Sequence, residues 1–170
     1  MGEYTHIIHS FEPVYNENSR VLILGSLPSV KSREDGFYYG HPRNRFWKVA
    51  AAVTGKPTPV TIEEKKAFLL ESHIAVWDVI AECDIIGSSD ASIKNVHAAD
   101  ISVITAFCPD IAVFTNGGTA SALYDKHILP KSKRPAVRLP STSPANAAWN
   151  TERLTEEWKK ALLPFLYPDT

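Results

Sequence analysis

The chain has 170 residues, of which 44% are hydrophobic and 22% are charged, and its formal net charge is -1. These values predict one domain over residues 1–170, and they exclude a disordered chain or a protein that binds polyanions through a generally basic surface. The N-terminus lacks a signal-peptide pattern and no apolar run approaches the ~20 residues of a membrane span, which favours a cytoplasmic location.

The first predicted element is a strand over residues 20–24, RVLIL, because a short, continuously apolar run is typical of a strand buried on both faces. A long loop is expected over residues 25–45, and then a helix over residues 46–53 that ends at Gly55. The sequence TIEE at residues 61–64 is a capping-box pattern, which predicts that a second helix begins there and extends to about residue 72.

A second apolar strand, HIAVWDV, is expected over residues 73–79, and a polar loop over residues 87–93. Asp100 is expected to cap a helix over residues 101–107. The third strand is predicted over residues 111–114.

Asn116 and two glycines turn the third strand into a helix that extends to about residue 128. A fourth strand is predicted over residues 136–139, and a last helix from about residue 150 to residue 166. The apolar positions of that helix predict one buried stripe, formed by Leu154, Trp158, Leu162 and Phe165.

Four apolar strands that alternate with helices predict an α/β fold, a three-layer α/β/α sandwich around a four-stranded parallel sheet. Ligands of such sheets bind beyond the carboxyl ends of the strands. The residues at those four ends are a Gly25–Ser29 loop, Asp78, Asn116 with its glycines, and the segment 139–146. We therefore expect one site at this edge of the sheet.

Several kinds of chemistry lack their motif. The chain has no GxxxxGK[ST], no GxGxxG and no GxSxG, which argues against nucleotide hydrolysis, dinucleotide binding and a serine hydrolase. A triad built from Ser26, Ser29 or Ser32 with His41 remains a weak alternative. Cys83 and Cys108 have no metal-binding spacing, so we expect buried, reduced thiols and no zinc or iron–sulfur site.

The residues that remain suit a planar ligand. Tyr39 or Phe37 offers a flat face, and stacking on an aromatic ring is worth ~1–3 kcal/mol per base. Asn44 offers an uncharged amide that can orient a water molecule, and Asp78 can accept a hydrogen bond from a ring N–H. A stiff loop of short donors at residues 141–143 can grip phosphate oxygens. A nucleobase fits this set better than an acyl or phosphoryl substrate.

Each of these residues also has a structural interpretation. Phe37 and Tyr38 could cover the edge of the sheet, and Asn44 could cap the helix that follows it. Asp78 could form an ion pair with a lysine or arginine. The remaining candidates could be turn residues or solvated surface charges: His41, Arg43, Arg45, and residues 141–143.

Two segments resemble a known family. They are VLILGSLPSVKSREDGFYYGHPRNRFWKV, residues 21–49, and LPSTSPANA, residues 139–147. They resemble the uracil-DNA glycosylase superfamily, and within it the hypoxanthine-DNA (deoxyinosine) glycosylase branch. The HPRNRFWKV portion is also similar to the mismatch-specific uracil-DNA glycosylases. The resemblance covers nearly the whole chain after about Val14.

The resemblance implies an enzyme of base excision repair that flips a deaminated base out of DNA and hydrolyses its N-glycosidic bond. It implies a catalytic role for Asn44, base stacking on Tyr39, and base reading by Asp78 with Gly25 and Ser26. DNA contacts are implied for Arg43 and for the residues of the second segment: Ser141, Thr142, Ser143, Pro144, Ala145 and Asn146.

Leu27 departs from the family, because many members carry Asp or Asn at the corresponding position and leucine cannot polarise water. This departure favours hypoxanthine over uracil as the substrate. We expect a monomer that acts on single- or double-stranded DNA, needs no metal or cofactor, and contacts no membrane. The alternatives are a uracil or mismatch-specific glycosylase, and a non-catalytic module that binds nucleic acid or a nucleotide.

Overall fold

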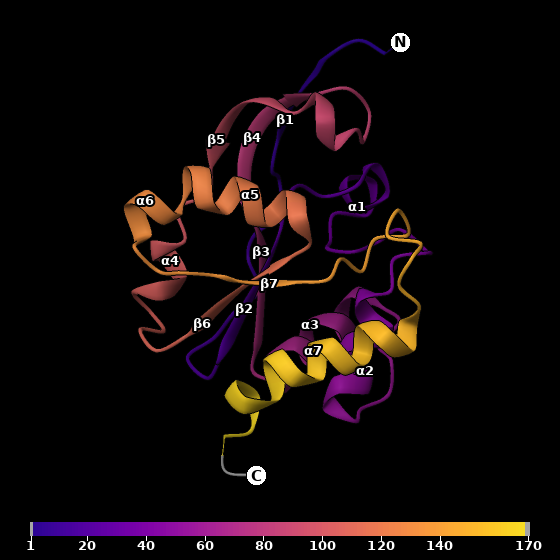
Figure 1. Ribbon diagram of the computed structural model, residues 1–170, viewed down its shortest axis with the longest axis vertical. Helices are drawn as coiled ribbons and strands as arrows, with labels where there is room; N and C mark the ends of the chain where they lie inside the picture. Colours follow the sequence, from indigo (N-terminus) through magenta and orange to yellow (C-terminus); the bar gives the residue numbers. More distant parts are fainter. Residues whose placement is uncertain (1, 169–170) are drawn as a thin grey trace.

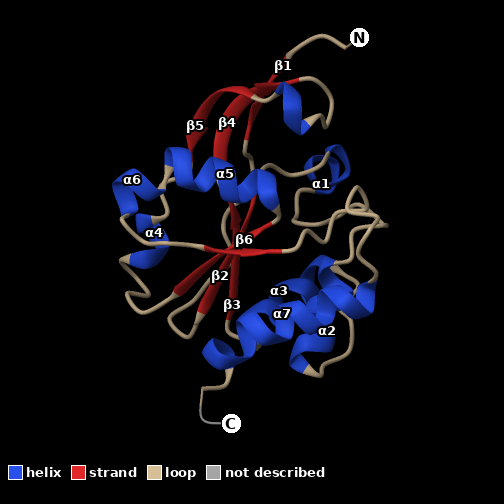
Figure 2. Cartoon of the chain, viewed as in Figure 1, coloured by secondary structure: helices blue, strands red, loops and turns tan. Residues whose placement is uncertain are grey.

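The computed structural model describes residues 2–168, and its centre is a four-stranded parallel sheet (Figures 1 and 2). The sheet contains β2 (Val21–Gly25), β3 (Ile74–Asp78), β6 (Ala112–Asn116) and β7 (Val137–Leu139), in the order β3-β2-β6-β7. Val21 pairs with Ile74 on one side and with Ala112 on the other, so these three strands start together and also end together.

Helices cover both faces of this sheet, because alternate residues of its strands point to opposite sides. On one face, Ile23 packs in a cluster with α2 (Phe46–Thr54), α3 (Ile62–Glu71) and α7 (Thr151–Leu166). On the other face, Leu22 packs with residues of α4 (Ser102–Thr105) and α5 (Gly118–His127). The predicted three-layer α/β fold is confirmed.

Local signals set most helix boundaries where they were predicted. The Thr61 hydroxyl accepts the Glu64 N–H and the Glu64 carboxylate accepts the Thr61 N–H, so the capping box is formed. Asn150 caps α7 by accepting the Arg153 N–H. The predicted stripe of α7 needs one correction, because Leu166 is buried in the place assigned to Phe165, whose side chain is 46% exposed.

Other elements differ from the prediction. A helix, α1 (Val30–Asp35), lies within the expected long loop and is capped by Ser29. Helix α4 is shorter than expected, and Asp100 accepts the Ser102 N–H just before it. Two further short helices are η1 (Asp90–Ser92) and α6 (Leu129–Ser132).

A second sheet was not predicted. It is antiparallel and consists of β1 (Thr5–Ile8), β4 (Ile80–Ile85) and β5 (Lys94–Ala98), in the order β1-β4-β5. Strand β4 follows β3 after the single residue Val79, so the carboxyl end of β3 lies where the two sheets meet. This sheet places the N-terminal segment next to Asp78, because His9 donates its backbone N–H to the Ala81 carbonyl at 2.8 Å.

Both cysteines are free and buried, as predicted. Burial raises the pKa of the Cys83 and Cys108 thiols, and it therefore keeps them protonated and weakly reactive. Among the described helices, none combines the length and the hydropathy that a membrane span requires.

The corrected stripe of α7 predicts a difference between two neighbouring residues. Leu162→Ala should lower the free energy of unfolding by ~2–5 kcal/mol, because Leu162 is 1% exposed and its removal leaves a cavity. Phe165→Ala, at the half-exposed position, should cost less than half as much. Urea denaturation of the two variants measures the difference, and equal losses would contradict this assignment of the buried face.

Candidate active site

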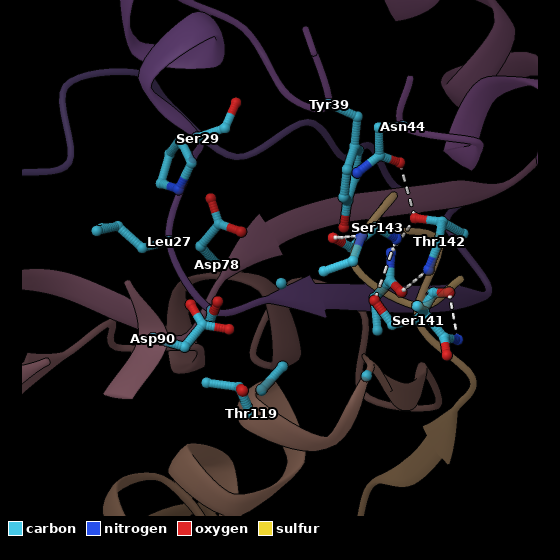
Figure 3. Close-up of a pocket in the computed structure, with 18 of the residues that line it drawn as sticks. Leu27, Ser29, Tyr39, Asn44, Asp78, Asp90, Thr119, Ser141, Thr142 and Ser143 are labelled. Carbon is cyan, nitrogen blue, oxygen red and sulfur yellow. Dashed lines mark hydrogen bonds between the residues drawn. The ribbon is translucent and has the colours of Figure 1, made fainter. Parts of the chain in front are cut away.

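A cavity of about 720 Å³ lies at the carboxyl ends of the parallel strands (Figure 3). Its walls come from the loop after β2, the end of β3, the turn between β6 and α5, and the segment after β7. A parallel sheet brings these ends to one edge, so residues far apart in sequence meet there. Most of the predicted site residues line this cavity: Gly25, Ser26, Tyr39, Asn44, Asp78, Ser141, Thr142, Ser143, Ala145 and Asn146.

The amide of Asn44 is held in one orientation. Its Oδ1 accepts the Phe46 N–H at 2.9 Å and the Thr142 hydroxyl at 2.8 Å. Because a backbone N–H can only donate, these bonds fix the oxygen toward the protein and leave the Nδ2 group on the other side, toward Tyr39 (Figure 3). Asn44 therefore caps the start of α2 with its oxygen and can offer its amide N–H groups to a molecule in the cavity.

Tyr39 has a rigid ring and a strained backbone. Phe46 stacks on one face of the ring, with the centroids 4.0 Å apart and 15° between the planes, which leaves the opposite face for a ligand. The φ angle of Tyr39 is 52°, a value that bulky residues rarely adopt, and Trp47 Nε1 stabilises it by donating to the Tyr39 carbonyl at 3.2 Å. Strain of this kind is commonly found at functional sites.

The Tyr39 hydroxyl is buried toward Asn116, and it forms no hydrogen bond of normal geometry with the described residues. Burial, together with the nearby Asp78 carboxylate, raises the pKa of the Tyr39 phenol well above its usual value. The group therefore remains protonated at neutral pH, where it acts as a neutral donor or acceptor.

Asp78 projects from the last residue of β3 over Gly25, its partner on β2. A Cβ atom at Gly25 would lie 2.5 Å from Asp78 Oδ1 and 3.3 Å from the Tyr39 hydroxyl, so only glycine leaves room for this approach. The partner of Asp78 is neither lysine nor arginine: His9 Nε2 lies 2.8 Å from Asp78 Oδ2. Both side chains are about 95% buried, at 4% and 5% exposure.

Hydrogen bonds from side chains of the protein itself hold the segment after β7 in place. Arg45 donates to the carbonyl oxygens of Ser143 at 2.9 Å and Asn146 at 3.1 Å, and also to the Trp149 carbonyl. Arg45 is therefore a structural clamp and not a solvated surface charge. The Asn146 side chain adds a bond to the Ser141 carbonyl at 3.0 Å.

The structure places some predicted residues elsewhere. Phe37 is 4% exposed and stacks on Trp47 in the core, so it is not available to a base in the cavity. Thr142 is fully buried and its hydroxyl is used within the protein, which removes it as a free phosphate ligand. Arg43 and Pro144 are exposed outside the cavity lining, and their DNA contacts stay predictions.

The geometry does not support the triad of serine and His41 that the sequence left open. The His41 Nδ1 atom accepts the Arg43 N–H in a local turn, and no serine of residues 2–168 hydrogen-bonds to its ring. The Ser29 hydroxyl caps α1. Within the same residues, no group of three or more His, Cys, Asp or Glu side chains is arranged to hold a metal ion.

Sequence analysis missed three residues of this region. His9 lies far from the motifs in sequence, and the unpredicted second sheet places it beside Asp78. Asn116 was noted only as a strand end, yet its side chain holds Thr142 through two hydrogen bonds. Arg138 was predicted only as part of the apolar strand β7, although its guanidinium lies over Gly118 at the cavity wall. An arginine within an otherwise apolar strand was a usable signal for the last of these.

A parallel sheet with a polar cleft at its carboxyl edge, and a flat aromatic wall within that cleft, defines a protein that binds a planar ligand. The family model described as "Uracil DNA glycosylase superfamily" matches residues 12–166, and the chain belongs to this family of DNA glycosylases. The curated relatives include two proteins named "Hypoxanthine DNA glycosylase". The one from Methanosarcina acetivorans is 32% identical over 90% of this chain and 96% of its own length. The one from Methanosarcina barkeri is 31% identical over 68% and 73%.

The fold has a solved counterpart as well. The solution NMR structure of a Methanosarcina acetivorans protein, described there as a candidate uracil DNA glycosylase, superimposes with a TM-score of 0.77. It shares 32% sequence identity, and the alignment covers 92% of this chain and 96% of that one. The resemblance inferred from the two sequence segments is confirmed.

The Arg45 clamp predicts a local effect. Arg45→Lys removes the planar fork that reaches three carbonyl groups, so hydrogen exchange of the amides in residues 145–149 should become at least about tenfold faster. Arg43→Lys, two residues earlier on an exposed side chain, is the matched control and should change nothing. Equal protection of the segment in both variants would contradict the clamp.

Proposed function

We propose that this protein is a monofunctional DNA glycosylase that removes hypoxanthine from deoxyinosine in DNA, as the first step of base excision repair. The observation that carries the proposal is one cavity in which the Asn44 amide, the Asp78 carboxylate and the ring of Tyr39 meet. The names and coverage of the Methanosarcina relatives support the choice of base.

The base would enter the cavity by flipping out of the helix, which costs a few kcal/mol and costs less for a mismatched pair. Its ring would stack on the face of Tyr39 that Phe46 leaves open. Asp78 would accept the N1–H of hypoxanthine, because an ionised carboxylate can only accept. Adenine, the undamaged parent, carries a lone pair at that position and would be repelled.

Departure of the base places negative charge on it and positive charge on the sugar. Backbone N–H groups of the loop after β2 are the donors that we assign to the base anion, in the manner of an oxyanion hole. Asn44 Nδ2 would hold the attacking water beside C1′ of the sugar by donating to one of its lone pairs. The other lone pair forms the C1′–O bond as the C1′–N bond breaks, and the proton that the water loses is taken up by the departing base anion. This assigns Asn44 a positional effect, since its oxygen is not free to accept a proton.

The DNA backbone would pass over the segment after β7, at Ser141, Ser143, Ala145 and Asn146, with Arg138 and Arg43 near its phosphates. A local basic contact of this kind is compatible with a net charge of -1. We further propose that the protein acts as a monomer. A single-stranded substrate avoids the cost of breaking a base pair, and a duplex substrate would need the segment to fill the vacated stack.

A substrate panel tests the function. Oligonucleotides that contain deoxyinosine, deoxyuridine, deoxyxanthosine or only normal bases are incubated with the protein, and abasic sites are revealed with alkali. We expect excision of hypoxanthine above all other bases. We also expect no strand cleavage before alkali, because no lysine lines the cavity to form a Schiff base. A preference for uracil would make uracil, and not hypoxanthine, the substrate. Binding of the oligonucleotides without excision of any base would favour the non-catalytic module.

The Asn44 amide is tested by a pair of substitutions. Asn44→Asp keeps the oxygen that caps Phe46 and contacts Thr142 but replaces the Nδ2 donor, so excision should fall by ~10²-fold or more with little loss of stability. Asn44→Ala should reduce excision as strongly and also destabilise the protein by ~1 kcal/mol, through loss of the cap. Single-turnover rates and urea denaturation measure the two effects, with Asn18→Asp on the exposed surface as the control. Normal excision by the Asn44→Asp variant would remove Asn44 from the reaction.

A further inference from the structure

We propose that His9 is a positioning residue that makes Asp78 a reader of one N–H group, and that it thereby sets which bases the cavity accepts. The proposal rests on the function proposed above. His9 would occupy one oxygen of the Asp78 carboxylate and leave the other to the base. It lies outside residues 12–166, the part of the chain that the family model matches.

The contact between the two side chains is well defined. His9 Nε2 lies 2.8 Å from Asp78 Oδ2, and the side chains are only 4% and 5% exposed. A carboxylate oxygen can only accept, so the His9 ring donates its Nε2–H to it. The ring is held by Phe11, whose centroid is 4.6 Å away, and by Tyr38 at 5.9 Å. Oδ2 is therefore occupied by a buried side chain that is itself packed in place.

The second oxygen has the opposite surroundings. Asp78 lines the cavity (Figure 3), and its Oδ1 has no hydrogen-bond partner among residues 2–168. Oδ1 lies directly over Gly25, in the space that any Cβ atom there would fill. The cavity therefore presents one carboxylate oxygen that accepts no hydrogen bond from residues 2–168, with the Tyr39 hydroxyl close to it.

A carboxylate with one free oxygen selects different bases from a carboxylate with two free oxygens. The reading edge of guanine carries two adjacent donors, N1–H and the exocyclic N2–H, and a carboxylate with both oxygens free would accept both. Hypoxanthine carries N1–H alone, next to a C–H group. A site built around a single donor loses little with hypoxanthine, whereas the N2–H of guanine would find the second carboxylate oxygen of Asp78 already occupied by His9. Masking Oδ2 thus removes the advantage that a carboxylate would otherwise give to guanine, the normal base of most similar shape.

The same chemistry predicts which bases the pair does not separate. Uracil also presents a single N–H, at N3, whereas cytosine and adenine present a lone pair at the equivalent position. His9 and Asp78 together should therefore disfavour guanine, cytosine and adenine, and they leave the rejection of thymine to contacts with its methyl group. Discrimination between hypoxanthine and uracil must come from the size of the cavity.

The competing interpretation is that the His9–Asp78 pair only fastens the N-terminal segment to the core. The two interpretations differ in one readout. A fastening role changes stability and lowers excision of every base by the same factor. A masking role changes the ratio between bases, because it alters the edge that Asp78 presents.

The experiment uses three variants of the full chain. His9→Leu removes the donor, and His9→Gln restores a donor amide at a position close to that of Nε2. Ile7→Ala loosens the packing of the same N-terminal segment against Ile80, Cys83 and Ile85, and it leaves the His9–Asp78 pair unchanged. For each variant kcat/KM is measured on oligonucleotides with deoxyinosine, deoxyuridine or deoxyguanosine, and urea denaturation gives the stability.

We expect His9→Leu to narrow the preference for deoxyinosine over deoxyguanosine at least about tenfold. His9→Gln should recover most of that preference, and Ile7→Ala should keep it while lowering stability. An unchanged preference in His9→Leu, or an equal narrowing in Ile7→Ala, would overturn the proposal. If His9→Leu does not fold, His9→Asn takes its place, since its amide is too short to reach Oδ2.

A binding measurement separates this proposal from the proposed function. Wild-type protein and variants are titrated with oligonucleotides that carry the 2′-fluorinated, hydrolysis-resistant analogue of deoxyinosine or deoxyguanosine. If wild-type protein excises no base, the proposed function fails. The His9 proposal then stands or falls on whether His9→Leu changes the ratio of the two dissociation constants.

Discussion

The buried hydroxyl of Thr142 joins the parts of the cavity that are most distant in sequence. It donates to Asn44 Oδ1 at 2.8 Å and accepts from Asn116 Nδ2 at 2.9 Å. The Thr142 backbone takes part as well, because its N–H donates to Asn116 Oδ1 at 3.1 Å and its carbonyl accepts the Arg45 N–H at 3.0 Å. Every polar group of Thr142 therefore forms a hydrogen bond. These bonds hold the segment after β7 next to both the end of β6 and the start of α2. The Thr142 hydroxyl and the Phe46 N–H together fix the orientation of the Asn44 amide.

The same region shows how the fold offsets the strain at Tyr39. A φ angle of 52° costs of order 1–3 kcal/mol for a residue other than glycine. The stacking of Tyr39 on Phe46 and the bond from Trp47 both come from the first turn of α2, the helix that Asn44 caps. The cap, the aromatic wall and the amide donor are thus one mechanical unit. A substitution at any one of the three should alter the geometry of the other two. The effects of such substitutions on excision should therefore not be additive.

Features that depend on contacts between residues close in sequence could be predicted from the sequence, whereas features that depend on long-range contacts could not. The strands, the carboxyl edge, and the places of Tyr39, Asn44 and Asp78 followed from apolar runs and short motifs, because a parallel sheet converts local pattern into one common edge. The second sheet was missed because β5, KNVHA, is polar and short and has no apolar signature. His9 could not be found without that sheet. Phe37 and Tyr39 are chemically similar neighbours, and only the backbone turn at Tyr39 decides which ring enters the core and which lines the cavity.

The leucine at position 27 is compatible with the roles proposed for Asp78 and Asn44. Leu27 packs against the small apolar cluster of Ile80, Cys83 and Ile85, which are residues of β4 in the second sheet. A carboxylate at this position would lose that packing, and it would share the cavity with the carboxylate of Asp78. Two like charges in one partly dry cavity raise the pKa of one of them, so one of the two acids would tend to be neutral and could not act as an ionised group does. If Asp78 reads the base as proposed, an uncharged donor suits the cavity better than a second carboxylate. Asn44 provides that donor, and its orientation does not depend on pH.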